Sequence, residues 1–146
     1  MTRLLGVDLG ERRIGLAVAD SDSRAVRPLA TIRRANPTRD ARTIARVCEE
    51  QRIDEVVVGL PLNMDGSEGL QAAETRAWAA SVASVIDRVI VWRDERLTSE
   101  QAEGRMEIAS RGRAGGPPSA ASRASRRARI DREAAAAIVQ AELDAR

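Results

Sequence analysis

Residues 3–20 read RLLGVDLGERRIGLAVAD, two apolar runs that each contain or end in an aspartate and that flank the turn-like Gly10–Arg13. Two such runs joined by about four residues predict a β-hairpin, with one strand over 3–9 and the next over 14–20. A third candidate strand covers residues 26–33. The start of the chain therefore predicts a hairpin-led meander.

Strands and helices alternate through the rest of the chain. Val56-Val57-Val58 is an apolar run without alternation, which is typical of a strand covered on both faces. Residues 111–128, rich in Gly, Pro, Ser and Arg, predict a mobile basic loop. The other predicted elements, in chain order, are a helix over 37–51, a strand over 54–60, a helix over 70–86, a strand over 89–92, a helix over 98–110 and a helix from about Ile130. This order predicts a single α/β domain over residues 1–146.

The composition excludes several classes of enzyme. Among its 146 residues the chain has no His, no Lys and a single cysteine, so it holds no His-based nucleophile pair, no Schiff-base lysine and no multi-cysteine zinc site. Cys48, at helical spacing from Ile44, and Trp78 are expected in the core. Catalysis is left to carboxylates, hydroxyls, arginines and backbone, which points to bound hard cations.

The positive charge is concentrated in one segment. The whole chain has 24 arginines against 22 acids, a net charge of +2. Residues 111–132 contain seven of these arginines and one acid, Asp131. A mildly acidic body with one strongly basic segment predicts a polyanion partner, although a solvated surface in an arginine-rich protein is the alternative. No run approaches the ~20 apolar residues of a membrane span, so we expect a cytoplasmic protein without membrane contact.

Three acids stand at the ends of predicted elements. Asp8 ends an apolar strand, Glu95 follows the last strand, and Asp131 starts the last predicted helix beside its apolar stripe. A carboxylate next to a core is costly unless it is paired, caps a helix or binds a cation. Turn positions for Asp8 and Glu95, and a favourable helix dipole for Asp131, are the alternatives. Asp20 and Asp94 are weaker candidates for the same site.

Four motifs in the same order resemble the YqgF (RuvX) family. They are Asp8-Leu9-Gly10 with Arg12 to Asp20, Val58 to Ser67, Asp94-Glu95-Arg96-Leu97-Thr98-Ser99, and Ile130-Asp131-Arg132-Glu133-Ala134-Ala135. The resemblance implies an RNase H-like fold, with a mixed five-stranded sheet flanked by helices. It also implies a nuclease, related to resolvases of four-way DNA junctions, that processes the 5′ end of precursor 16S ribosomal RNA. Ser99 and the Gly-Gly-Pro-Pro-Ser insert at 115–119 depart from the family pattern.

The resemblance places Asp8, Glu95 and Asp131 on the family's acidic active-site positions. Clustered carboxylates would hold one or two Mg²⁺ or Mn²⁺ ions for phosphodiester hydrolysis. The expected nucleic-acid contacts are Arg12, Arg96, Asn63, Arg123, Arg126 and Arg127. For Asn63 the alternative is that it holds its own loop, and Arg12 and Arg96 are alternatively ordinary surface arginines.

Other interpretations remain open from the sequence. The partner is expected to be nucleic acid, either precursor rRNA or branched DNA, and cutting two symmetric strands would need a homodimer. A nucleic-acid-binding ribosome-maturation factor with weak catalysis is the alternative. An ATP-handling protein of the actin and sugar-kinase type also carries an Asp-x-Gly loop, but it needs two such domains.

Overall fold

An antiparallel hairpin opens the sheet. The computed structural model describes residues 1–94 and 120–146. Strands β1 (Arg3–Leu9) and β2 (Arg13–Asp20) pair antiparallel, with Asp8 opposite Gly15 and Arg3 opposite Asp20. The Gly10 N–H donates to the Arg13 carbonyl at 2.8 Å and closes the turn. Strand β3 (Val26–Arg33) pairs antiparallel with β2. The predicted hairpin and third strand are confirmed.

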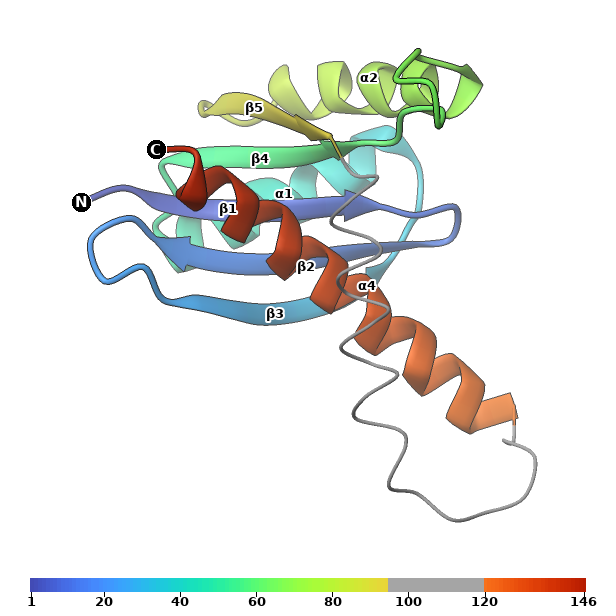
Figure 1. Ribbon diagram of the computed structural model, residues 1–146, viewed down its shortest axis with the longest axis horizontal. Helices are drawn as coiled ribbons and strands as arrows, with labels where there is room; N and C mark the ends of the chain where they lie inside the picture. Colours follow the sequence, from blue (N-terminus) through green and yellow to red (C-terminus); the bar gives the residue numbers. More distant parts are fainter. Residues whose placement is uncertain (95–119) are drawn as a thin grey trace.

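Two parallel strands complete the sheet. Strands β4 (Glu55–Leu60) and β5 (Val89–Asp94) run parallel to β1, and the order across the sheet is β3-β2-β1-β4-β5 (Figure 1). The expected mixed five-stranded sheet is confirmed. Strands β1, β4 and β5 all finish at the end of the sheet where β2 begins. We call this end the turn end.

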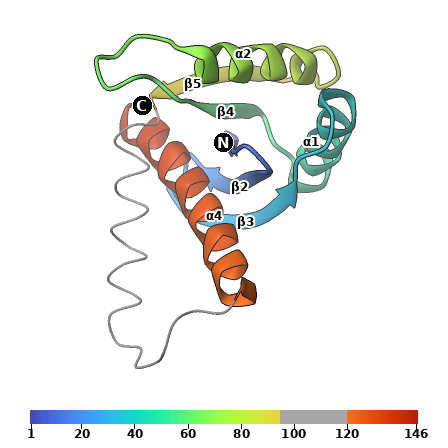
Figure 2. The ribbon, with the colours of Figure 1, turned by 90° about the vertical axis from the view of Figure 1, so that its right-hand side faces the viewer.

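Helices cover both faces of the sheet. Helices α1 (Pro37–Gln51) and α2 (Leu70–Ala83) pack on one face, and α4 (Ala120–Asp144) crosses the other (Figure 2). The Asn36 side chain accepts a hydrogen bond from the Arg39 N–H at 2.9 Å and caps α1, with Pro37 at its first position. Because both faces are covered, the strands need apolar residues on both sides, which explains their continuous apolar runs.

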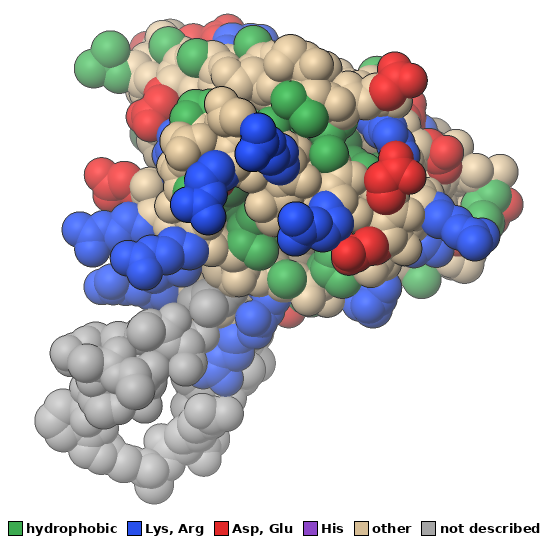
Figure 3. All heavy atoms as spheres, turned by 180° about the vertical axis from the view of Figure 1, so that it is seen from behind, with side chains coloured by type: hydrophobic (Ala, Val, Ile, Leu, Met, Phe, Trp, Pro, Cys, Tyr) green, Lys and Arg blue, Asp and Glu red, His purple; other side chains and the backbone are tan. Residues whose placement is uncertain are grey.

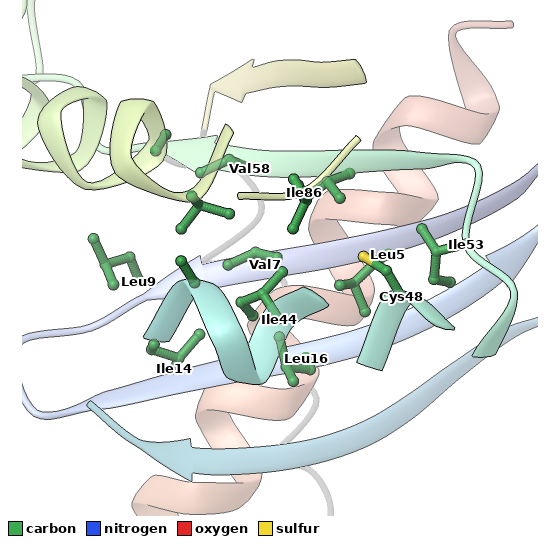
Figure 4. Close-up of a cluster of buried hydrophobic side chains, with 14 of the residues drawn as sticks. Leu5, Val7, Leu9, Ile14, Leu16, Ile44, Cys48, Ile53, Val58 and Ile86 are labelled. Atoms are coloured by element: carbon green, nitrogen blue, oxygen red, sulfur yellow. The ribbon is translucent and has the colours of Figure 1, made fainter. Parts of the chain in front are cut away.

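The larger core lies between the sheet and helices α1 and α2. It joins alternate strand residues such as Leu5 and Val7 with Ile44 and Cys48 of α1 (Figure 4). Trp78 of α2 is 3% exposed. Its Nε1–H donates to the buried Asp40 carboxylate at 3.1 Å, which satisfies the one polar atom of the indole. The core roles predicted for Cys48 and Trp78 are confirmed.

Helix α4 approaches the sheet so closely that glycines are required beneath it. A Cβ atom on Gly6 would lie 2.5 Å from the Ala135 carbonyl oxygen. A Cβ atom on Gly15 would collide still more severely with the carbonyl oxygen of Asp131. The smaller core under α4 is accordingly built from small residues, including Ala17, Ala19 and Ala135. Tight packing of backbone on backbone fixes where α4 crosses β1 and β2.

Two predicted boundaries are wrong. Residues 120–128, predicted as part of a loop, belong to α4, which begins ten residues before the predicted start at Ile130. Alanine and arginine favour helix, and no Gly or Pro follows Pro118 until the end of the chain. The remainder of that predicted loop, 111–119, and the predicted helix 98–110 lie outside the described residues. Helix α2 ends at Ala83 rather than at 86, and Ile86 reaches the core from the following turn.

None of the helices in the described ranges combines the length and apolarity needed to cross a membrane.

Gly15→Ala is expected to lower the free energy of unfolding by about 1–3 kcal/mol, because the added methyl must displace the α4 backbone. Urea unfolding followed by circular dichroism measures the loss. Gly69→Ala is the control, because its methyl group would meet only the Asn63 side chain, 3.1 Å away, which is able to move. Equal stability losses in the two variants would contradict a rigid contact between α4 and β2.

Candidate active site

Asp8 is a buried carboxylate on the face of the sheet that α4 covers. Along β1, Leu5, Val7 and Leu9 face the core under α1 and α2, so alternation places Asp8 on the opposite face with Leu4. Asp8 is 7% exposed. A carboxylate this deep is costly in the free protein unless charges or hydrogen bonds compensate it. Its position at the turn end makes it a candidate for the chemistry of the site.

Asp131 of α4 lies directly over β2, at the residue that pairs with Asp8 of β1. Its carbonyl oxygen packs against Gly15, and Gly15 is the cross-strand partner of Asp8. Because α4 begins at Ala120, Asp131 lies in the middle of the helix and not in its first turn. The sequence-based expectation that Asp131 starts a helix is therefore wrong, and the helix dipole does not explain this acid. The crossing of α4 brings two of the three predicted acids together.

The two carboxylates influence each other electrostatically. The pKa of Asp131 is raised above its ordinary value, mainly because burial disfavours its charged form. The hydrogen bond from Arg13 opposes this shift, and the negative charge of Asp8 adds to it. A pair of close acids held against their charge repulsion is a typical feature of active sites.

Arg13 is a site residue that sequence reasoning missed. Its Nε–H donates to Asp131 Oδ2 at 3.0 Å, and both side chains are partly buried. Arg13 is two residues before Gly15 on β2, so strand alternation places it on the face that α4 covers. This two-residue spacing from Gly15 is the sequence signal that places Arg13 on the same face of the sheet as Asp8. Without knowledge of where α4 crosses, it could not identify Asp131 as the partner.

A cleft of about 390 Å³ opens beside Asp131. It is lined by Gly10, Glu11, Arg12, Arg13, Arg127 and Asp131. Two of the predicted nucleic-acid contacts, Arg12 and Arg127, therefore share a cleft with Asp131. Arg126, next to Arg127 on α4, is exposed. The first part of α4 projects beyond the sheet (Figure 1). Glu95, Arg96 and the side chain of Arg123 lie outside what the structure describes.

Asn63 lies in the loop that follows β4 and holds that loop together. Its backbone N–H donates to the Ser67 carbonyl at 2.9 Å, and its side-chain Nδ2 donates to Ser67 Oγ at 3.0 Å. The alternative role of Asn63, to hold its own loop, is therefore observed. Contact between Asn63 and phosphate remains a prediction.

Asp20 does not belong to this site. It ends β2 opposite Arg3, whereas Asp8 lies near the other end of the same strand pair. Its Oδ1 accepts from the Asp22 N–H at 2.8 Å and so stabilises the turn between β2 and β3. The expectation that Asp20 could assist the acids is wrong, because an antiparallel partner strand ends at the opposite end of the sheet. Asp94 does end β5 at the turn end.

The acids fit a hard divalent cation by their chemistry. Asp8 and Asp131 offer oxygen donors whose mutual repulsion a cation would relieve. Within residues 1–94 and 120–146 no group of three or more potential metal-ligating side chains is found. The third predicted acid, Glu95, is next in the chain after Asp94 and lies beyond the described part of β5.

Known proteins resemble this chain over almost its whole length. The family described as RuvX, Holliday junction resolvase, matches residues 2–145. A protein of Anaeromyxobacter sp. (strain Fw109-5), named "Putative pre-16S rRNA nuclease", is 42% identical over 144 residues, which cover 99% of this chain and 98% of that protein.

Solved structures with much lower identity share the fold. RuvC of Thermus thermophilus in complex with a Holliday junction substrate has a TM-score of 0.58 at 16% identity, covering 99% of this chain and 95% of that one. The fowlpox virus resolvase in complex with Holliday junction DNA has a TM-score of 0.57 at 12% identity, covering 99% and 98%. These likenesses confirm the expected RNase H-like fold.

In the metal-free protein, Asp131→Asn is expected to raise the free energy of unfolding at pH 7. Because the folded-state pKa of Asp131 is raised, the folded chain binds this proton more tightly than the unfolded chain does. Stability therefore falls as the pH rises from the ordinary carboxyl range through the raised pKa, and asparagine avoids that loss. Urea unfolding with a chelator, at pH values from about 4 to 8, measures both proteins. We expect the advantage of the variant to be largest at neutral pH and to shrink on acidification. A less stable variant at pH 7 would show that the ion pair with Arg13 outweighs the burial cost.

Proposed function

This chain belongs to the RuvX family and is a nuclease, and we propose that it hydrolyses phosphodiester bonds of structured nucleic acid at Asp8 and Asp131 with the help of Mg²⁺ or Mn²⁺. One observation carries this proposal. The carboxylates of Asp8 and Asp131 lie close enough to interact electrostatically, and Asp131 lines a cleft that also contains Arg12, Arg13 and Arg127. Acids that repel each other suit a cation, and arginines suit phosphate.

The position of each acid indicates its proposed role. Asp8 is buried on the central strand β1, so its carboxylate is held rigidly, and Asp131 approaches it from α4. We propose that Glu95, the third acid of the family motifs, completes the set that would hold the cation. When bound, the cation supplies Lewis-acid activation of the attacking water and stabilises charge at the leaving oxygen.

The arginines are proposed to hold the phosphate chain. Arg12 and Arg127 line the cleft, and Arg126 is exposed beside it. With Arg96 and Arg123 they form the set that we propose for backbone contacts. The chain has only two aromatic residues, and the buried Trp78 offers no stacking platform. Recognition is therefore proposed to rest on phosphates and on the shape of the nucleic acid.

The proposed substrate is a folded or branched nucleic acid. Curated relatives are named for precursor 16S rRNA, and proteins of the same fold have been solved on Holliday junctions. A cleavage panel with Mg²⁺ or Mn²⁺ tests the proposal on a four-way DNA junction, duplex DNA, single-stranded RNA and a precursor of 16S rRNA. Cleavage confined to one structured substrate would identify the substrate class, and a two-fold dimer is expected if it is the junction. Tight binding with no cleavage of any probe would instead favour a ribosome-maturation factor.

Asp8→Asn is expected to reduce cleavage by about 100-fold or more, because asparagine keeps the shape but loses the charge that holds the cation. Nucleic-acid binding should be unchanged or tighter, since one negative charge near the phosphates is removed. Gel-based cleavage rates and fluorescence anisotropy measure the two properties. Asp22→Asn, an exposed acid near the opposite end of the sheet, is the control and should cleave normally. Undiminished cleavage by Asp8→Asn would refute the mechanism.

Arg13→Gln is expected to tighten Mn²⁺ binding several-fold. The guanidinium donates to a carboxylate oxygen of Asp131, which is one of the side chains that would hold the cation, and one unit charge at such range is worth on the order of 1 kcal/mol in a well-solvated site. Isothermal titration calorimetry of the nucleic-acid-free protein measures the affinity. Arg12→Gln removes an exposed charge from the same cleft without breaking the Asp131 contact, so its effect should be smaller. Weaker Mn²⁺ binding by Arg13→Gln would show instead that Arg13 holds Asp131 in position for the ion.

A further inference from the structure

We propose that an arginine-lined furrow leads from the acidic site across the β1–β2 turn to the end of β3 and binds the sugar-phosphate backbone of one arm of the substrate. Arg33 would be its outermost contact. This inference rests on the proposed function and adds to it the direction in which the nucleic acid leaves the site. Arg33 was not among the contacts expected from the sequence.

Two adjoining hollows form the furrow. The cleft beside Asp131 shares Glu11, Arg12 and Arg13 with a larger hollow of about 610 Å³. The larger one continues past Thr31 and Ile32 to Arg33 and Arg34. Asp8 is opposite Gly15, which in turn is opposite Thr31, so the furrow spans two strand spacings, about 10 Å. That length suits a short stretch of backbone with about two successive phosphates rather than a single ion.

Its arginines differ in how they are engaged. Arg13 is paired with Asp131, and Arg34 donates to the Gly10 carbonyl and to Glu74, both at 3.0 Å. Through these contacts Arg13 and Arg34 fix the sides of the furrow. Arg12 and Arg33 are exposed, and neither forms an ion pair within the part of the chain that the structure describes. Their planar guanidinium groups are suited to paired hydrogen bonds with phosphate oxygens.

The charge distribution gives the furrow a direction. A third hollow, of about 410 Å³, opens from the same turn toward α2. Glu11 lines all three hollows, but this one adds Glu74, and the arginine that the described residues contribute to it, Arg34, is already paired with Glu74. A phosphate chain would be repelled there and attracted toward β3. Figure 3 shows arginine side chains gathered at the end of the molecule from which α4 projects.

The test measures binding of the cleavage-impaired Asp8→Asn protein to a four-way DNA junction and to an RNA hairpin by fluorescence anisotropy at several salt concentrations. Adding Arg33→Ala should weaken binding about eightfold at 0.1 M salt and flatten the plot of log affinity against log salt by about 0.9 on duplex arms, the value for one lost phosphate contact. Arg27→Ala is the matched control, because Arg27 is also exposed on β3 but lies at its other end. It should leave affinity and slope unchanged.

A variant that is expected to bind nucleic acid more tightly shows whether the losses of affinity come from misfolding. Glu11 is the acid at the turn where the hollows meet, so Glu11→Gln should tighten binding several-fold. Glu50→Gln removes an equivalent exposed charge near the far end of α1 and should have little effect. A destabilised protein would not bind more tightly.

The outcomes separate the two proposals. If the Asp8→Asn protein binds neither probe, the proposed function fails and the furrow fails with it. A second outcome is that the Asp8→Asn protein binds both probes and that Arg127→Ala weakens this binding, but that Arg33→Ala has no more effect than Arg27→Ala. This outcome would refute the furrow and leave the proposed nuclease site standing. A loss specific to Arg33→Ala, together with the gain from Glu11→Gln, supports the furrow.

Discussion

The contact on which the site depends is the packing of the α4 backbone against two glycines of the sheet. Gly6 lies under Ala135 and Gly15 under Asp131, and neither position has room for a Cβ atom. A helix held by backbone contacts has little freedom to slide or rotate, because any shift creates a clash or a void. Asp131 is therefore fixed over the strand next to Asp8, and the cleft with Arg12 and Arg127 follows from that placement.

This placement has an electrostatic cost that the protein offsets with arginine. Burial and the nearby charge of Asp8 both raise the pKa of Asp131, whereas Arg13 lowers it by hydrogen bonding. Lysine and histidine are absent from the chain, so every compensating side-chain cation is a guanidinium, which stays charged and whose planar fork matches both carboxylate and phosphate. The same residue type can therefore balance the charge of the acids and would suit contacts with a phosphate chain.

Much of the fold was predictable because its signals are local. The two apolar runs of residues 3–20 predicted β1 and β2, and Val56-Val57-Val58 predicted a strand covered on both faces. The start of α4 was predicted too late, because the arginines and serines of 120–128 suit either a loop or a helix and only the fold decides. The sequence suggests that Asp20 assists Asp8, because both apolar runs of the hairpin carry an aspartate near their ends. Only the antiparallel pairing of β1 and β2 shows that the two aspartates lie at opposite ends of the sheet.

The sequence by itself determined the chemistry that is available: carboxylates and arginines, with no histidine, no lysine and one cysteine. It also determined that Asp8 lies near the end of a buried strand, because an apolar run is a property of neighbouring residues. Only the tertiary structure decided which charges meet. The ion pair between Arg13 and Asp131 joins residues 118 positions apart, and it exists because α4 crosses β2 at Gly15. Local patterns do not specify the crossing point of two elements so distant in the chain, since it depends on the packing of every residue between them.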